Sequence, residues 1–341
     1  MTRRLTPGKK KGLDAVADAR GVIAALAIDQ RGAMRALFGK AMNVSPDSVA
    51  GEKLVQYKEA VSRVLTSHAS AILLDPEYGL PAARIRAKTA GLLLAYEKTG
   101  YDKAVKGRLP ALLDCWSAQR LMDAGADSVK LLLYYAPSSE AAVNDAKHAF
   151  VERVGAECAA CDVPFFLEIV NYGEGMEDKS EEFARLKPDV VAQSMTEFSK
   201  PRYRVDVLKV GVPVNMDFVE GSPSATGKIL YSRKAALDYY RVASDAAGIP
   251  FIYLSQGVSN ETFQYALELA TEAKVPFSGV LCGRATWKDG VSVLVKDGEN
   301  ALNDWLATQG VRNIENVNLH LQAAVPWQGR YESHSDGKSS A

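Results

Sequence analysis

The stretch Asp206-Val-Leu-Lys-Val-Gly-Val-Pro-Val-Asn215 places one lysine inside an otherwise apolar run. An apolar run this dense predicts a β-strand that is buried on both faces, as in a parallel sheet. Because side chains alternate along a strand, Lys209 shares one face with Gly211 and Pro213. Burial removes hydration from an ammonium and so favours the neutral amine, which can attack a carbonyl. Lys209 is therefore a candidate Schiff-base lysine; the alternative is a lysine at the strand edge whose head reaches solvent.

Seven other short apolar runs of the same kind occur along the chain, and amphipathic stretches separate most of them. The eight predicted strands are residues 22–28, 70–74, 91–95, 128–133, 164–169, 207–214, 250–254 and 278–282. Eight strands that alternate with helices, without a linker between domains, predict a single α/β domain, a (β/α)8 TIM barrel. We expect this barrel and an N-terminal helix to occupy residues 1–327, and a polar tail to occupy residues 328–341.

The composition argues against several classes of partner. Lys+Arg and Asp+Glu both number 41, so the chain has no electrostatic footprint for nucleic acid or an anionic membrane. No apolar run is long enough to cross a bilayer, and the N-terminus lacks the apolar core of a secretory signal. We therefore expect a cytoplasmic protein. No two of the four histidines have metal-ligand spacing, and Cys158 and Cys161 continue a helical apolar stripe, so we expect no protein-bound metal.

Four titratable side chains are expected at the C-terminal end of the barrel, where active sites of this fold lie. They are Asp29, Lys130, Glu168 and Lys209. A second ammonium about 6 Å from Lys209 would lower the pKa of that lysine by about two units, a role that suits Lys130. A salt bridge from Lys130 to Glu168 or Asp29 is a compatible alternative. Glu168 is the first candidate for general acid and base, and Asp29 is the second, either orienting substrate hydroxyls or tuning the lysine.

The last two predicted strands end in glycine-containing turns. The seventh strand leads into Ser255-Gln256-Gly257, and the eighth leads into Gly283-Arg284. Backbone N–H groups of the two glycines and the guanidinium of Arg284 could together hold one phosphate dianion. A glycine at one strand end alone would indicate only a turn, but the pair at this position in a barrel favours a phosphate site.

The sequence resembles the tagatose 1,6-bisphosphate aldolase family of class I aldolases. The matching motifs are Ala27-Ile-Asp-Gln-Arg-Gly32, Leu73-Leu-Asp-Pro-Glu-Tyr-Gly-Leu-Pro81, Gly91-Leu-Leu-Leu-Ala-Tyr-Glu-Lys-Thr-Gly-Tyr-Asp102, Val129-Lys-Leu-Leu-Leu-Tyr-Tyr135, Pro164-Phe-Phe-Leu-Glu168, Asp206-Val-Leu-Lys-Val210 and Gly279-Val-Leu-Cys-Gly-Arg-Ala-Thr-Trp287. The resemblance implies a barrel with a Schiff base on Lys209 and no metal or other cofactor. Gln256 and Gly211 depart from the family, which usually has a small residue and an acidic residue at these positions.

The leading hypothesis is an aldolase of lactose and galactose catabolism. It would reversibly cleave D-tagatose 1,6-bisphosphate, and also fructose 1,6-bisphosphate, to dihydroxyacetone phosphate and glyceraldehyde 3-phosphate. One alternative is a related Schiff-base aldolase acting on a sulfonated ketose phosphate, with Gln30 and Arg31 as candidate ligands of the distal anion. Another is a sugar-phosphate-binding regulatory barrel, although the joint presence of all four titratable residues argues against lost catalysis. We expect a phosphorylated ketose as the partner, and a homo-oligomer.

Overall fold

The computed structural model describes residues 4–102 and 104–331. Within these residues, eight parallel strands pair in sequence order and close into a barrel in which β8 returns to β1. The strands are β1 Ile23–Ala27, β2 Ala71–Leu74, β3 Gly91–Ala95, β4 Ser128–Tyr135, β5 Phe165–Asn171, β6 Val207–Gly211, β7 Phe251–Leu254 and β8 Gly279–Cys282. The predicted (β/α)8 TIM barrel is confirmed.

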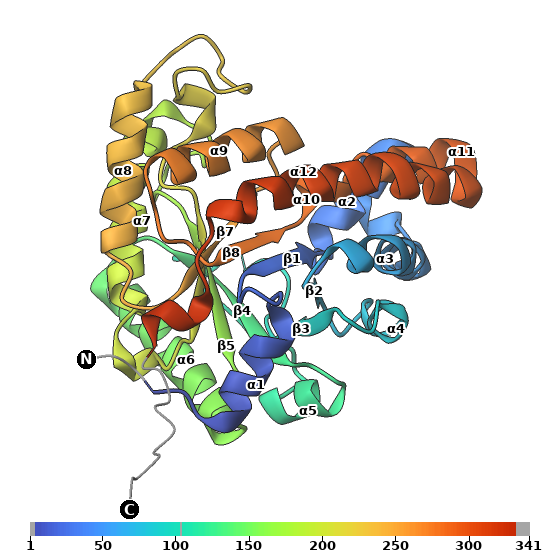
Figure 1. Ribbon diagram of the computed structural model, residues 1–341, viewed down its shortest axis with the longest axis horizontal. Coiled ribbons are helices and arrows are strands. Elements are labelled where there is room, and N and C mark those ends of the chain that lie inside the picture. The colour runs from blue at the N-terminus through green and yellow to red at the C-terminus, as the bar shows by residue number, and fades with distance from the viewer. Residues whose placement is uncertain (1–3, 103, 332–341) are drawn as a thin grey trace, which may run out of the picture.

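Helices surround the barrel (Figure 1). Those of the described residues are α1 Pro7–Val16, α2 Gly32–Met42, α3 Gly51–Leu65, α4 Leu80–Ile85, α5 Ala118–Asp123, α6 Ala141–Ala160, α7 Glu181–Phe198, α8 Arg233–Asp245, α9 Asn260–Glu272, α10 Arg284–Trp287, α11 Gly290–Trp305 and α12 Val311–Leu319. Ser232 and Ser259 cap α8 and α9, because their hydroxyls accept hydrogen bonds from backbone N–H groups of the first turn. None of these helices combines the length and apolar content that a membrane span requires.

The strands are apolar on both faces because each face packs against a different core. Inward-facing residues such as Ala25, Leu73 and Ile252 fill the barrel interior. Their neighbours, such as Leu26, Ile72 and Phe251, pack against the surrounding helices. This arrangement explains why the sequence shows continuous apolar runs instead of an alternation of apolar and polar residues. The same alternation of faces, continued past the end of a strand, determines which of the following side chains point toward the barrel axis.

The strand boundaries differ from the predicted ones mainly at three strands. Strands β4 and β5 each continue two residues further than predicted, to Tyr135 and Asn171. Strand β6, predicted over 207–214, ends at Gly211. Pro213 has no N–H to contribute to a ladder, and the chain leaves the sheet just before it.

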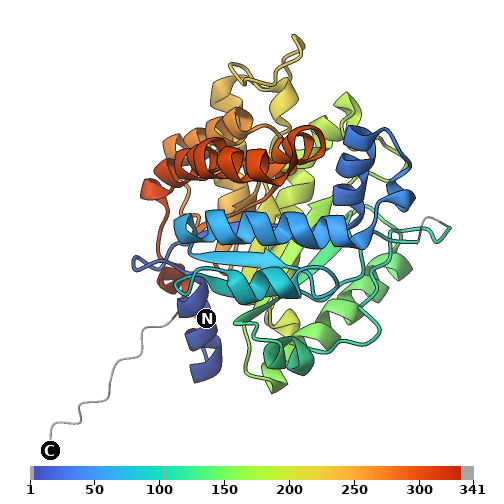
Figure 2. The same cartoon turned by 90° about the vertical axis from the view of Figure 1, so that its right-hand side faces the viewer.

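The N-terminal end of the barrel is covered by two segments that are far apart in the sequence. Helix α1 and the short helix η7, Trp327–Arg330, both pack there (Figure 1), and Figure 2 shows α1 in dark blue beside the N-terminus. The backbone N–H of Trp327 donates to the carbonyl of Gly21 at 2.9 Å, and the Tyr331 hydroxyl donates to the carbonyl of Asp206 at 2.6 Å. Residues 328–331 of the predicted polar tail are therefore part of the fold, and residues 332–341 lie outside the described residues.

Candidate active site

Five buried titratable side chains occupy inward-facing positions at the strands β1, β3, β4, β5 and β6. They are Asp29, Glu97, Lys130, Glu168 and Lys209. Asp29 and Glu97 continue the inward alternation just beyond β1 and β3, whereas the other three lie within β4, β5 and β6. The pairing of β5 with β6 sets Glu168 directly beside Lys209 in the ladder. The barrel thus brings together all four of the titratable residues that the sequence singled out, with one further carboxylate.

Lys130 is the centre of this cluster. Its Nζ lies 2.8 Å from Oδ2 of Asp29, 2.7 Å from Oε1 of Glu97 and 2.7 Å from Oε2 of Glu168. Burial alone would lower the pKa of Lys130, but the three carboxylates raise it well above its ordinary value. Burial alone would raise the pKa of Asp29 and Glu168, but the lysines hold both carboxyls below their ordinary range. Lys130 is thus a charged ammonium that holds three carboxylates in place.

Glu168 connects the two lysines. Its Oε2 atom, which lies 2.7 Å from Lys130, also lies 2.9 Å from Nζ of Lys209. The sequence predicted Lys130 as a positive charge near Lys209 and, compatibly, as a salt-bridge partner of Glu168 or Asp29; Lys130 contacts both of these carboxylates, and one oxygen of Glu168 separates it from Lys209. With two ammonium groups and three carboxylates, the cluster carries one excess negative charge when all five groups are ionised.

The Glu97 carboxylate was not among the residues that the sequence singled out. It lies two positions beyond Ala95, the last residue of β3, and therefore on the same face as Ala95 and Leu93. Its Oε2 accepts the backbone N–H of Leu132 at 3.0 Å, while its Oε1 bonds Lys130. Continuing the strand alternation one step past the apolar run would have indicated this residue.

Gln30 and Arg31 follow Asp29 but have different environments. Nε2 of Gln30 donates to Oδ1 of Asp29 at 3.1 Å. Within the described residues, Oε1 of Gln30 is buried and has no hydrogen-bond partner, so it is suited to accept a bond from a substrate hydroxyl. The two terminal nitrogens of Arg31 donate to Oε2 of Glu77 at 2.6 Å and to the carbonyl of Glu97 at 2.9 Å. The Arg31 side chain ties three loops together, and its buried Nε, which has no partner among the described residues, is the donor left for the predicted role as an anion ligand.

The predicted phosphate turns lie side by side at the ends of β7 and β8. Gly257 has φ of 80°, and a Cβ built on it would lie 2.7 Å from Cζ of Arg284, so the guanidinium packs directly against this glycine. A Cβ on Gly283 would lie 3.3 Å from Nε2 of Gln30. Ser255 is buried directly after β7. Among the residues that the structure describes, no carboxylate pairs with Arg284, so its charge is available to an anion.

Gln256 covers the position next to the candidate Schiff-base lysine. A Cβ on Gly211 would lie 2.6 Å from Nε2 of Gln256, so the carboxamide fills the space that a side chain at 211 would take. Oε1 of Gln256 accepts a bond of 3.0 Å from Nζ of Lys187, which also donates to the carbonyl of Val214 at 3.1 Å. Burial lowers the pKa of Lys187 to about 8. The two positions that depart from the family pattern are therefore in contact, and Lys187 orients the amide.

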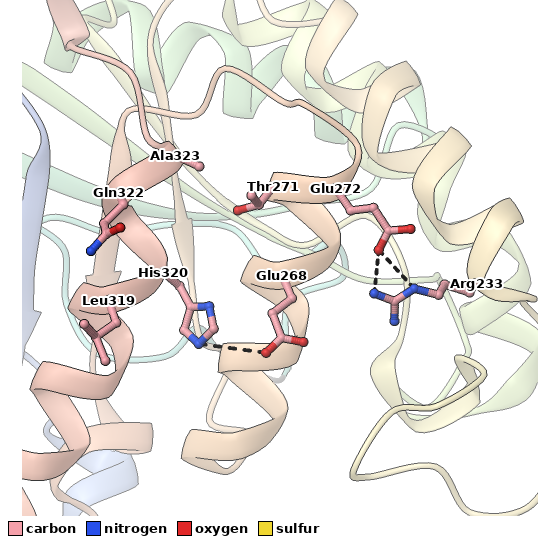
Figure 3. A pocket seen from close by; sticks show the side chains of 8 residues that line it. All are labelled: Arg233, Glu268, Thr271, Glu272, Leu319, His320, Gln322 and Ala323. Atoms are coloured by element: carbon pink, nitrogen blue, oxygen red, sulfur yellow. Dashed lines mark hydrogen bonds and ion pairs between the residues drawn. The ribbon is translucent and has the colours of Figure 1, made fainter.

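A hollow of about 430 Å³ lies elsewhere, between α8, α9 and the turn after α12 (Figure 3). Four of its polar side chains already contact one another in pairs. Arg233 Nε donates to Oε2 of Glu272 at 3.0 Å, and Nε2 of His320 lies 4.0 Å from Oε1 of Glu268. None of the inward-facing residues of the barrel lines this hollow. The chemistry is concentrated at the barrel axis instead.

Buried lysines that share a carboxylate inside a (β/α)8 barrel are typical of enzymes that process carbonyl compounds through a lysine. Sequence comparison gives the family. A model described as DeoC/LacD family aldolase matches residues 23–289. The chain therefore belongs to the DeoC/LacD family of aldolases.

Named relatives match nearly the whole chain. Tagatose 1,6-diphosphate aldolase 2 of Enterococcus faecalis is 51% identical over 331 residues, which cover 96% of this chain and 98% of that protein. Tagatose 1,6-diphosphate aldolase of Lactococcus lactis is 48% identical over 325 residues, covering 95% of this chain and 98% of that protein. The proteins of the same name from Listeria monocytogenes are 47% identical over 335 residues, with 98% and 97% covered.

Solved structures agree on the fold. Fructose-bisphosphate aldolase from Plasmodium falciparum superposes with a TM-score of 0.66 at 14% identity, covering 97% of this chain and 98% of that one. A Schiff base-forming fructose-1,6-bisphosphate aldolase superposes with a TM-score of 0.53 at 15% identity, covering 90% and 98%. At such low identity these likenesses support the barrel alone.

Proposed function

We propose that this protein is a class I aldolase that reversibly cleaves D-tagatose 1,6-bisphosphate, and also fructose 1,6-bisphosphate, through an imine on Lys209. The names of its relatives support the substrate class. The observation that carries the mechanism is the position of Lys209, a buried lysine whose Nζ lies 2.9 Å from a carboxylate shared with a second lysine. A buried amine beside a proton acceptor is what imine formation requires.

The first step joins Lys209 to the substrate. Glu168, the nearest carboxylate, accepts a proton from Nζ of Lys209, and the neutral amine attacks the ketone carbon C2. The resulting carbinolamine loses its oxygen as water, with a proton returned by Glu168, and a protonated imine remains. Lys130 keeps Glu168 in position throughout, because it binds the same oxygen atom from the other side.

The second step breaks the bond between C3 and C4. A carboxylate, Glu168 or Asp29, removes the proton from the C4 hydroxyl, and the bonding electrons move from C3–C4 into the iminium. Glyceraldehyde 3-phosphate leaves and an enamine remains on Lys209. The same carboxylate then protonates C3, and hydrolysis of the imine releases dihydroxyacetone phosphate. Because the iminium serves as the electron sink, we propose that the reaction needs neither a metal nor another cofactor.

The turns after β7 and β8 are the proposed site for the phosphate on C1. Arg284 has no acidic partner among the described residues and lies against Gly257, so its guanidinium and nearby backbone N–H groups can bind one dianion. Gln30, whose buried Oε1 lacks a partner in the described part of the chain, can accept a substrate hydroxyl nearby. A cytoplasmic location and a homo-oligomeric state stay predictions.

Turnover assays test this function. Purified protein would be given tagatose 1,6-bisphosphate, fructose 1,6-bisphosphate and a sulfofructose phosphate in parallel, each with and without EDTA, and triose phosphate would be measured. We expect cleavage of both bisphosphates at rates that EDTA does not change. Faster cleavage of the sulfonated substrate would instead favour the related sulfonate aldolase. Loss of all turnover with EDTA would contradict the imine mechanism.

A further inference from the structure

The barrel wall formed by β4 and β5 continues past the catalytic cluster toward the C-terminal end. Leu132 and Tyr134 follow Lys130 at two-residue steps and so share its inward face, as Val170 shares the face of Glu168. These three residues are half-buried, whereas the residues between them are buried against the helices. Tyr134 lies roughly 13 Å along β4 from Lys130, at about 3.3 Å per residue. This wall therefore leads outward from Lys130 and Glu168.

Arg108 stands at the outer end of this wall. The Cζ atom of its guanidinium lies 4.1 Å from the ring centre of Tyr172, 5.3 Å from that of Tyr101 and 5.8 Å from that of Tyr134. The three aromatic rings hold the planar guanidinium in one place, so binding of a ligand would cost little further side-chain entropy. Tyr172 is itself fixed, because its hydroxyl donates to the carbonyl of Gly107 at 3.1 Å.

The loop that carries Arg108 is attached to the catalytic cluster. It leaves the barrel after β3, and an antiparallel bridge between Glu97 and Leu112 closes its base. The N–H of Lys98 donates to the carbonyl of Ala111 at 2.8 Å across the same base. Since Glu97 bonds Lys130, the loop and the cluster share one residue. Arg108 is thus placed relative to the reacting groups by backbone pairing as well as by ring contacts.

The charge of Arg108 is only weakly compensated. The acidic side chain that pairs with it is Asp178, at 3.3 Å, and that carboxylate is 59% exposed. By contrast, Arg31 bonds Glu77 at 2.6 Å and is itself 5% exposed. The Arg108 side chain is 20% exposed, so an incoming anion can reach the guanidinium and exchange with the solvated Asp178 carboxylate.

Tyr134 lies between Arg108 and the reacting centre. Burial, followed by the Glu168 carboxylate, raises the pKa of Tyr134, and the Arg108 guanidinium acts in the opposite direction. The phenol is therefore within electrostatic reach of both groups. Arg284 lies at β8, on the opposite side of the barrel from β4. A substrate attached to Lys209 with one anion at Arg284 would direct its far end toward β4 and β5.

We propose that Arg108, framed by Tyr101, Tyr134 and Tyr172, binds the anionic group on the far carbon of the ketose substrate. This inference rests on the proposed aldolase function and names the ligand of its second charged end: a phosphate, or a sulfonate with the same tetrahedral oxyanion chemistry. Arg108 takes the place of Arg31, whose two terminal nitrogens already bond Glu77 and Glu97 and leave only Nε without a partner among the described residues.

Arg108→Gln tests the subsite by removing charge while keeping a planar polar group. Steady-state kinetics would compare tagatose 1,6-bisphosphate, tagatose 1-phosphate and a sulfofructose 1-phosphate. We expect KM for substrates with a distal anion to rise about tenfold to a hundredfold, the loss typical of one charge-assisted contact. KM for tagatose 1-phosphate should change less than about twofold, since that substrate lacks the distal group. Whichever anionic substrate loses more identifies the group that the subsite prefers.

Lys106→Gln is the matched control, because Lys106 lies in the same loop but is exposed and pairs with Glu140. It should leave every KM unchanged. Arg108→Lys keeps the charge, and it should retain part of the preference for the bisphosphate even if Arg108→Gln folds poorly. Equal losses for substrates with and without the distal anion, or no loss for either, would overturn the subsite.

Reduction with borohydride in the presence of dihydroxyacetone phosphate separates the two proposals, since this product carries no distal anion. If the wild-type protein forms no adduct, the proposed function fails whatever Arg108 does. If the wild-type protein and Arg108→Gln form the adduct equally and the substrate preference also persists, only the subsite fails. We expect the wild-type protein and Arg108→Gln to form the adduct equally, and Arg108→Gln to lose the preference for substrates with a distal anion.

Discussion

Oε2 of Glu168 lies 2.9 Å from Nζ of Lys209 and 2.7 Å from Nζ of Lys130, so one oxygen atom serves both lysines. The two lysines require different protonation states of the Glu168 carboxylate during the reaction. Exchange of a proton with Lys209 requires Glu168 to change its protonation state, whereas Lys130 favours the ionised form. Asp29 and Glu97 share the charge of Lys130, which leaves Glu168 free to take a proton during turnover without removing the only partner of that lysine.

Glu168→Gln should therefore lower kcat by a factor of about 10² to 10⁴, the range expected for loss of a general acid and base. The amide keeps the size of the side chain and can still contact both lysines, so KM should change little. Steady-state kinetics on tagatose 1,6-bisphosphate measure both constants. A kcat close to that of the wild-type protein would assign the proton transfers to Asp29.

Lys130→Met should destabilise the fold as well as stop turnover. It leaves Asp29, Glu97 and Glu168 buried without their common cation, and breaking a buried ion pair costs about 3–5 kcal/mol. Urea unfolding at pH 7 gives the free energy of unfolding of each variant. Lys106→Met, at an exposed pair, is the control and should unfold like the wild-type protein. Equal midpoints for the two variants would mean that the cluster is not held together by Lys130.

Much of the fold and of the catalytic cluster follows from the sequence, because both depend on local alternation. The apolar runs set the strands, and each strand fixes the face of its lysine or glutamate, as for Lys209 beside Glu168. Contacts between distant segments could not be read in this way. Lys187 and Arg108 come from a helix and a loop, and their relation to the barrel depends on packing across elements. Nor could the sequence show that both terminal nitrogens of Arg31 bond Glu77 and Glu97.

Lys187→Met should make the protein more stable at pH 7. The pKa of Lys187 is lowered from 10.5 to about 8, so the unfolded chain binds the proton more tightly than the folded protein does. Below pH 8 the buried charge costs on the order of 3 kcal/mol, and stability recovers as pH rises from 8 toward 10.5. Loss of two hydrogen bonds offsets part of the gain, which leaves about 1 kcal/mol at pH 7.

Urea unfolding at pH 7 and pH 10 measures this difference, which should shrink or change sign at the higher pH. Lys234→Met, at an exposed position of α8, is the control and should follow the pH profile of the wild-type protein. A Lys187→Met variant that is less stable by the same amount at both pH values would show that the hydrogen bonds of Lys187 outweigh its desolvation.

Arg284→Ala should mainly raise KM for phosphorylated substrates. A guanidinium that grips the C1 phosphate acts in the ground state and in the transition state alike, so kcat should fall much less than kcat/KM. A loss of about tenfold to a hundredfold in kcat/KM corresponds to one charge-assisted contact. The constants come from assays with tagatose 1,6-bisphosphate and with dihydroxyacetone phosphate as product inhibitor. An unchanged KM and inhibition constant would place the phosphate away from the turns after β7 and β8.

Trapping the imine tests the role of Lys209 most directly. Borohydride added together with dihydroxyacetone phosphate should inactivate the enzyme irreversibly, with EDTA giving no protection and borohydride alone having little effect. Lys209→Arg, which keeps the charge but cannot form an imine, should lose activity by several orders of magnitude, remain folded and form no adduct. Peptide mass mapping of the reduced wild-type protein should then find the added triose phosphate on Lys209. An adduct on Lys130 or Lys187, or turnover without any adduct, would contradict the imine on Lys209.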